Sequence, residues 1–186
     1  IKAPLGVYSV LGNHDYGEYT SWKSNEEKNR NFKNLLKAQK EFGWNLLLNE
    51  NDTISVDGNK IKVIGVENWA SSRFQQYGDL DKAYNGLNNE DFKILMTHNP
   101  SHWNAKVTDA YNDIDLTLSG HTHGLQYGID IGDFRVSPVR LAYKQWADLY
   151  ELNKQYIYVN RGFGFMGYPG RVGILPEITI LELKKS

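Results

Sequence analysis

The chain has 186 residues, of which 40% are hydrophobic and 23% are charged, and its formal net charge is −1 at pH 7. This balance is typical of a globular domain with a hydrophobic core and differs from that of a disordered chain. The near-neutral charge argues against long nucleic acids as partners, and the absence of cysteine excludes disulfides and thiolate metal sites.

The first element expected from the sequence is a buried strand over residues 5–11, a run that leads directly into Gly-Asn-His-Asp. A helix follows from Ser24, because Ser24 and Glu27 form a capping-box pattern and Gly43 suits the position after a helix end. The inner face of this helix is expected to carry Phe32, Leu35, Leu36, Gln39 and Phe42.

The rest of the chain alternates strand patterns with a few helices, which predicts an α/β layered domain. Further strands are expected at 46–51, at 53–66 as a hairpin turning at Asp57-Gly58-Asn59, and at 92–98, 115–121, 156–160 and 177–183. A short helix is expected at 79–87, and Pro100 is expected to start a loop or a helix that runs to about Asp109. The glycine-rich segment 161–173 predicts a loop with exposed aromatic residues, either a substrate lip or a surface that packs on another part of the protein.

Four of the five histidines follow strand-like runs directly, and they are His14, His98, His121 and His123. Loops at strand ends are where α/β folds collect functional groups, and imidazole is the commonest metal ligand in proteins. Asn13 adds an amide oxygen beside His14. The fifth histidine, His102, is interpreted as a hydrogen-bonded surface residue. Arg161, just after a strand, either clamps a phosphate or pairs with a carboxylate.

Three short motifs occur in order, GNHD (12–15), THNP (97–100) and GHTH (120–123). Together they resemble the later metal-binding motifs of the calcineurin-like metallophosphoesterases. The tail, with SGHTHGLQYG, YIYVNRGFGF and GILPEITILEL, is similar to the bacterial branch often found behind membrane-anchoring segments. The resemblance runs from about residue 5 to the end and implies an α/β fold in four layers (αββα), a β-sandwich flanked by helices.

The resemblance also implies a site with two divalent metal ions, which manganese, iron, zinc or nickel would suit. The implied metal ligands are Asn13, His98 and His121 for one ion and His123 for the other. His14 would protonate the leaving oxygen or stabilise charge, and Asp15 would orient His14. The implied reaction is attack on a phosphodiester, phosphomonoester or lipid-linked pyrophosphate by a hydroxide that the two metals activate.

Two upstream motifs of the family, Asp-x-His and Gly-Asp-x-x-Asp, do not occur in this sequence. We therefore expect residues 1–186 to be a single metallophosphoesterase domain that is truncated at its N-terminus, with an incomplete sandwich. This piece alone should bind at most one metal ion weakly, catalyse poorly, and self-associate through an open sheet edge. A membrane-attaching segment would lie upstream, so the expected location is membrane-associated or cytoplasmic in a bacterium.

Two alternatives to the enzyme remain open at this point. The fold could serve as a non-catalytic scaffold that binds protein partners, which predicts degraded metal motifs. It could instead hold one structural metal ion, in which case a chelator would unfold the chain without removing any activity.

Overall fold

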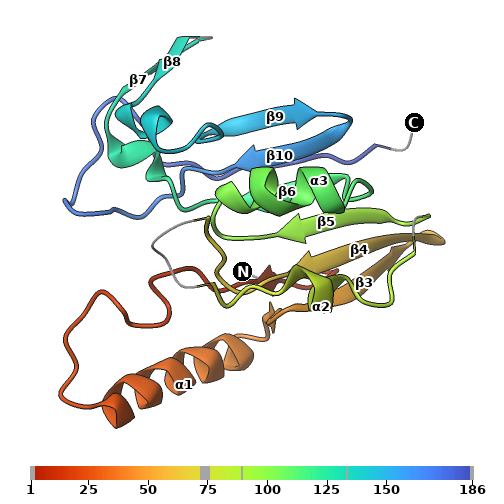
Figure 1. Cartoon of the computed structure of the whole chain (residues 1–186), viewed down its shortest axis with the longest axis horizontal. Helices are drawn as coiled ribbons and strands as arrows, with labels where there is room; N and C mark the ends of the chain where they lie inside the picture. Colours follow the sequence, from red (N-terminus) through yellow and green to blue (C-terminus); the bar gives the residue numbers. More distant parts are fainter. Residues whose placement is uncertain (1–2, 72–75, 89, 133, 185–186) are drawn as a thin grey trace.

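The computed structural model describes residues 3–71, 76–88, 90–132 and 134–184. Its centre is a six-stranded sheet with the order β3-β4-β5-β6-β10-β9 (Figure 1). The four middle strands are parallel: β4 (Asn59–Gly65), β5 (Phe92–Met96), β6 (Leu116–Ser119) and β10 (Gln155–Val159). The edge strands β3 (Glu50–Val56) and β9 (Asp148–Leu152) are antiparallel to their neighbours. This mixed sheet with helices confirms the α/β fold.

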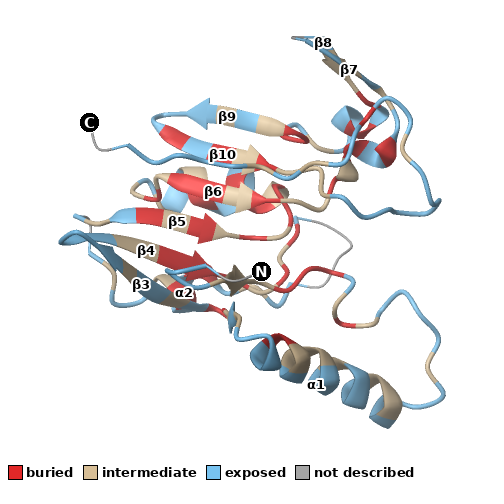
Figure 2. Cartoon of the chain, turned by 180° about the vertical axis from the view of Figure 1, so that it is seen from behind, coloured by how far each residue is buried: buried red, intermediate tan, exposed pale blue. Residues whose placement is uncertain are grey.

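Smaller elements surround this sheet. Two short pairs are β1 (Tyr8–Ser9) with β2 (Asn45–Leu46), and β7 (Ile129–Ile131) with β8 (Phe134–Val136). The helical elements are α1 (Asn25–Glu41), α2 (Leu80–Tyr84), the π-helix η1 (Trp103–Val107), α3 (Thr108–Ala110), η2 (His123–Gln126) and η3 (Pro138–Leu141). Buried residues concentrate on the middle strands (Figure 2), where Ile64, Leu95 and Ile157 are inaccessible to solvent.

The helix expected after Ser24 forms as α1, and its N-terminal cap is confirmed because Ser24 Oγ accepts a hydrogen bond from the Glu27 N–H at 3.2 Å. The prediction for Phe42 is wrong: its side chain is 67% exposed, because the residue lies just past the last helical turn. Gln39 does lie on the buried face, where its Oε1 accepts a hydrogen bond from the Ser9 hydroxyl at 2.6 Å.

The predicted hairpin is confirmed as β3–β4, with positive φ at Asp57 and Gly58, as a tight type I′ turn requires. The strand expected over 5–11 is limited to β1, and the strand expected over 46–51 is interrupted at Asn49, whose φ is 60°. Strands β7, β8 and β9 were not predicted, because each is only three to five residues long and most of their apolar side chains are exposed, including those of Ile131 and Phe134.

The prediction of a strand over 177–183 is also wrong. This segment runs extended in the structure but pairs with no strand of the described residues. Glu177 and Thr179 face inward and hydrogen-bond with each other, whereas Ile178 and Ile180 are 84% and 93% exposed. The alternation of apolar and polar residues therefore predicts the extended backbone of this segment correctly. A β-strand also needs a hydrogen-bonded neighbour, which the alternation does not supply.

Candidate metal centre

The parallel strands bring two of the sequence motifs to one edge of the sheet. His98 follows the end of β5 and His121 follows the end of β6, and these two strands are neighbours. Pairing continues past the strand ends, since the Gly120 N–H donates to the His98 carbonyl at 3.0 Å. Asn13 reaches the same edge from the turn that follows β1.

Three side-chain atoms converge at this edge. His98 Nε2 and His121 Nδ1 lie 2.9 Å and 3.0 Å from Oδ1 of the buried Asn13, and the two nitrogens are 3.1 Å apart. Neighbouring ligands of an octahedral ion with ligand distances of about 2.1 Å lie about 3.0 Å apart. The three atoms therefore fit adjacent positions around one divalent metal ion, and their nitrogen and oxygen donors suit manganese, iron, zinc or nickel.

The electrostatics of this triangle favour neutral imidazoles. Burial, together with the smaller effect of positive charge on neighbouring histidines, lowers the pKa of His98 to about 3 and that of His121 to about 4. Both rings are therefore uncharged at neutral pH, which is the state in which an imidazole nitrogen can bind a metal ion.

The GNHD turn is built for close packing around this triangle. A Cβ atom at Gly12 would lie 2.8 Å from the His98 ring, so only glycine fits there. Asp15 Oδ2 accepts a hydrogen bond from the Gly12 N–H at 2.7 Å and so closes the turn. His14 is exposed, and its ring stacks on Tyr19 with the centroids 4.3 Å apart. The predicted role of Asp15 in orienting His14 stays a prediction.

His123 lies near the triangle but outside it. Its positive charge would lower the pKa of His98 and His121, which shows that the rings are close. Its own Nδ1 is buried and has no hydrogen-bond partner among the described residues, so it is available to a ligand. Within the described residues, no three His, Cys, Asp or Glu side chains form a metal-binding group. The triangle therefore depends on the amide oxygen of Asn13 as its third donor. The described residues do not form a second complete metal site.

The GHTH loop holds its histidines in an unusual backbone conformation. His121 has a φ of 69° and His123 a φ of 52°, and Leu125 and Gln126 also have positive φ values. These left-handed conformations turn the chain sharply, so that His121 and His123 face different surroundings although they are only two positions apart.

His102 is a structural residue, as expected, although it lies in the interior and not on the surface. Its Nδ1 is 3.1 Å from the Thr97 hydroxyl, and its ring stacks on Trp69.

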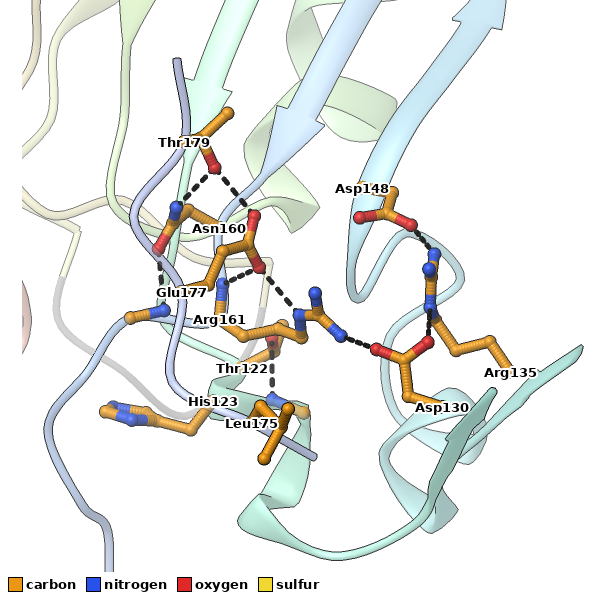
Figure 3. Close-up of polar contacts among 12 residues, drawn as sticks. Thr122, His123, Asp130, Arg135, Asp148, Asn160, Arg161, Leu175, Glu177 and Thr179 are labelled. Atoms are coloured by element: carbon orange, nitrogen blue, oxygen red, sulfur yellow. Dashed lines mark hydrogen bonds and ion pairs between the residues drawn. The ribbon is translucent and has the colours of Figure 1, made fainter. Parts of the chain in front are cut away.

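For Arg161, the structure shows the carboxylate alternative (Figure 3). Its Nε donates to Glu177 Oε2 at 2.6 Å and its Nη1 pairs with Asp130, and the side chain is only 11% exposed.

Two residues near the site were not found from the sequence. The hydroxyl of Tyr143 is 2.8 Å from His121 Nε2, and no motif marks a tyrosine in that stretch. The fully buried Gln126 hydrogen-bonds through its side-chain amide to the backbone of Met166, Tyr168 and Gly170. It thereby holds the loop 161–173, whose aromatic residues are exposed as predicted.

A model of the calcineurin-like phosphoesterase family matches residues 2–125, which is more than half of the chain. The chain belongs to the calcineurin-like phosphoesterase family. This family consists of phosphoester hydrolases that generally use divalent metal ions, and the matched region contains Asn13, His98, His121 and His123.

Individual members of the calcineurin-like phosphoesterase family show the same similarity. The chain is 31% identical over its full length to the metallophosphoesterase YkuE of Bacillus subtilis, of which it spans 59%. It is 31% identical over its full length to the transmembrane protein with metallophosphoesterase domain of Bos taurus, of which it spans 40%. Over 98% of its length it is 34% identical to the metallophosphoesterase Cj0846 of Campylobacter jejuni, of which it spans 43%.

Among solved structures, the NAD nucleotidase NadN of Haemophilus influenzae is similar, with 21% identity and a TM-score of 0.48. The similarity covers 83% of this chain and 33% of NadN. In the described parts of this family member, no helix combines the length and apolar character needed to cross a membrane.

Proposed function

We propose that this chain carries the Asn/His part of the active site of a metal-dependent phosphoester hydrolase. The observation that supports this most directly is the triangle of Asn13 Oδ1, His98 Nε2 and His121 Nδ1, with sides of 2.9 to 3.1 Å. These three atoms would hold one divalent metal ion, which lowers the pKa of bound water and stabilises charge on a phosphoryl group. His123, with its unpartnered buried Nδ1, would face a second ion.

The residues of the chain itself would perform the other steps. Burial keeps His98 and His121 neutral, so their nitrogen lone pairs are available at neutral pH. His14 lies exposed on the turn next to Asn13, where it can donate a proton to the leaving oxygen of a bound phosphoester. Asp15 holds that turn closed through Gly12. We propose that the chain by itself binds one ion weakly and turns over slowly, because only three donors converge.

The proposed substrate is a small phosphodiester, phosphomonoester or lipid phosphate. The net charge of −1 supports this class over long nucleic acids, which need a basic surface. The exposed Phe163 and Phe165 in the loop 161–173 offer apolar surface that an organic part of a phosphoester could contact. We also propose that this protein is bacterial and either attached to a membrane or cytoplasmic, which its similarity to bacterial proteins and to a transmembrane protein supports.

The test measures three quantities on the 186-residue chain. These are the binding of Mn²⁺ or Zn²⁺, the binding of inorganic phosphate with metal or with chelator, and the hydrolysis of bis-p-nitrophenyl phosphate. We expect metal binding that Asn13→Ala abolishes. Phosphate binding should require the metal and weaken in His14→Ala. Hydrolysis should be slow and stop with chelator.

Three results would contradict the proposal. Metal binding that persists in Asn13→Ala would refute the ligand assignment. Hydrolysis that proceeds equally with chelator would refute a metal-dependent reaction. A folded chain that binds neither metal nor phosphate would favour the alternative of a protein-binding scaffold with the same fold.

A further inference from the structure

The side chain of Tyr143 contacts the metal-binding triangle from behind. Its hydroxyl is 2.8 Å from His121 Nε2, the ring nitrogen that faces away from Asn13, and the two rings meet edge-on with their centroids 5.4 Å apart. Tyr143 comes from the segment just after η3 (Pro138–Leu141), far from all three sequence motifs. We propose that Tyr143 is a positioning residue that orients His121 for metal binding, an inference that rests on the proposed metal centre.

The neutral imidazole of His121 has two ring nitrogens, Nδ1 and Nε2. Such a ring carries a single proton, so if Nδ1 of His121 offers its lone pair to a metal ion, Nε2 must carry the hydrogen. That N–H lies in a largely buried environment and needs an acceptor. The Tyr143 hydroxyl oxygen is the acceptor at the observed 2.8 Å.

A tyrosine suits this position better than a carbonyl or carboxylate would. A hydroxyl group both donates and accepts, so it can satisfy Nε2 of His121 in either tautomer, with or without a metal ion at Nδ1. The hydroxyl oxygen also interacts with Asn99, a fully buried amide whose own Oδ1 already accepts from the Ser101 N–H at 2.9 Å.

The ring of Tyr143 is held independently of its hydroxyl. It packs against a small core cluster of Val139, Trp146, Ala147 and Ile174. Phenylalanine preserves this packing, so Tyr143→Phe removes the hydroxyl contact alone. Partners that orient metal-binding histidines typically change metal affinity by about tenfold or more when they are removed.

The experiment compares Mn²⁺ and Zn²⁺ affinity by titration calorimetry for the wild-type chain, Tyr143→Phe, Asn13→Ala and Tyr84→Phe. Tyr84 is the matched control, since its hydroxyl donates to Asp113 and its ring packs on the main core. We expect about tenfold weaker binding in Tyr143→Phe, wild-type affinity in Tyr84→Phe, and no binding in Asn13→Ala. The ¹⁵N spectrum of the His121 ring in the zinc-loaded chain should show a sharp Nε2–H in wild type that broadens or shifts in Tyr143→Phe.

The outcomes separate this inference from the proposed function. If Asn13→Ala loses the metal while Tyr143→Phe binds within twofold of wild type and its His121 spectrum is unchanged, the metal centre stands and the role of Tyr143 is refuted. If the wild-type chain binds neither ion, the metal centre and the role of Tyr143 are both refuted. An equal loss of affinity in Tyr84→Phe would show general destabilisation and would also refute it.

Discussion

His98 Nε2 and His121 Nδ1 lie 3.1 Å apart, although 23 positions separate the two residues in the chain. Both nitrogens also face the Asn13 side-chain oxygen, which accepts hydrogen bonds but cannot donate them. Hydrogen bonds along all three sides of this triangle would need three protons, but the two neutral rings can supply at most two. If both rings donate to Asn13, their N–H groups face each other. A divalent cation, by contrast, satisfies all three lone pairs at once.

Metal binding should therefore stabilise the chain. We expect Mn²⁺ at about one hundred times its Kd to raise the free energy of unfolding by about 2.7 kcal/mol, because the ion binds only the folded state. Thermal unfolding with and without Mn²⁺ measures this effect. Asn13→Ala should lose the metal-dependent shift, whereas Asn34→Ala on the exposed face of α1 should retain it. An undiminished shift in Asn13→Ala would contradict the ligand set.

The buried ion pair of Arg161 should matter for stability and not for phosphate binding. Arg161→Met removes the cation that pairs with Glu177 and leaves Asp130 with Arg135, and removing one partner of a buried pair costs about 3–5 kcal/mol. The double variant Arg161→Met with Glu177→Gln should recover part of this loss in urea unfolding. A phosphate affinity that falls in Arg161→Met while the free energy of unfolding is unchanged would show instead that Arg161 acts on the ligand.

Stability should fall in mild acid because of His102. Burial lowers the pKa of its ring to about 4, below the ordinary value near 6.5, so the unfolded chain binds one more proton between these two pH values. Protonation of His102 therefore does not change the free energy of unfolding above about pH 6.5. It lowers the free energy of unfolding by about 3 kcal/mol as the pH falls to about 4.

The comparison with His102→Asn isolates this contribution, since His98 and His121 titrate in both chains. Near pH 5 the slope of the free energy of unfolding against pH should be smaller in the variant by about 1.4 kcal/mol per pH unit. Equal slopes would mean that His102 is protonated in the folded state.

The extended segment 177–183 should promote self-association. Its outward-facing Ile178 and Ile180 are almost fully exposed, and exposed apolar residues on an extended backbone favour pairing with another chain. Sedimentation should show oligomers that grow with protein concentration and that decrease in the variant Ile178→Lys/Ile180→Lys. Leu141→Lys is the control, because Leu141 is 88% exposed on η3, outside the segment. An equal decrease in Leu141→Lys would assign the association to general surface hydrophobicity.

The sequence predicts that His98 and His121 meet, because they follow β5 and β6, parallel neighbours that end at one edge of the sheet. Asn13 follows β1, which lies outside this sheet, and it was singled out by the resemblance of GNHD to a family motif. The strand at 177–183 could not be predicted correctly, because local alternation determines an extended backbone but not its partner. Tyr143 could not be found at all, since its contact with His121 depends on how the segment after η3 folds back.

The positive φ values of His121 and His123 limit where the thermal stability of this protein can be raised without losing a candidate metal ligand. Each L-residue in a left-handed conformation costs about 1–2 kcal/mol, a cost that glycine avoids. Glycine at either position would relax the backbone but remove the imidazole. Screening variants of the metal-free chain for heat resistance should therefore favour substitutions in the GHTH loop that remove a candidate metal ligand, a trade-off common at functional sites. Stabilising mutations for this domain are better sought on α1 and the β3–β4 hairpin, where no such conflict exists.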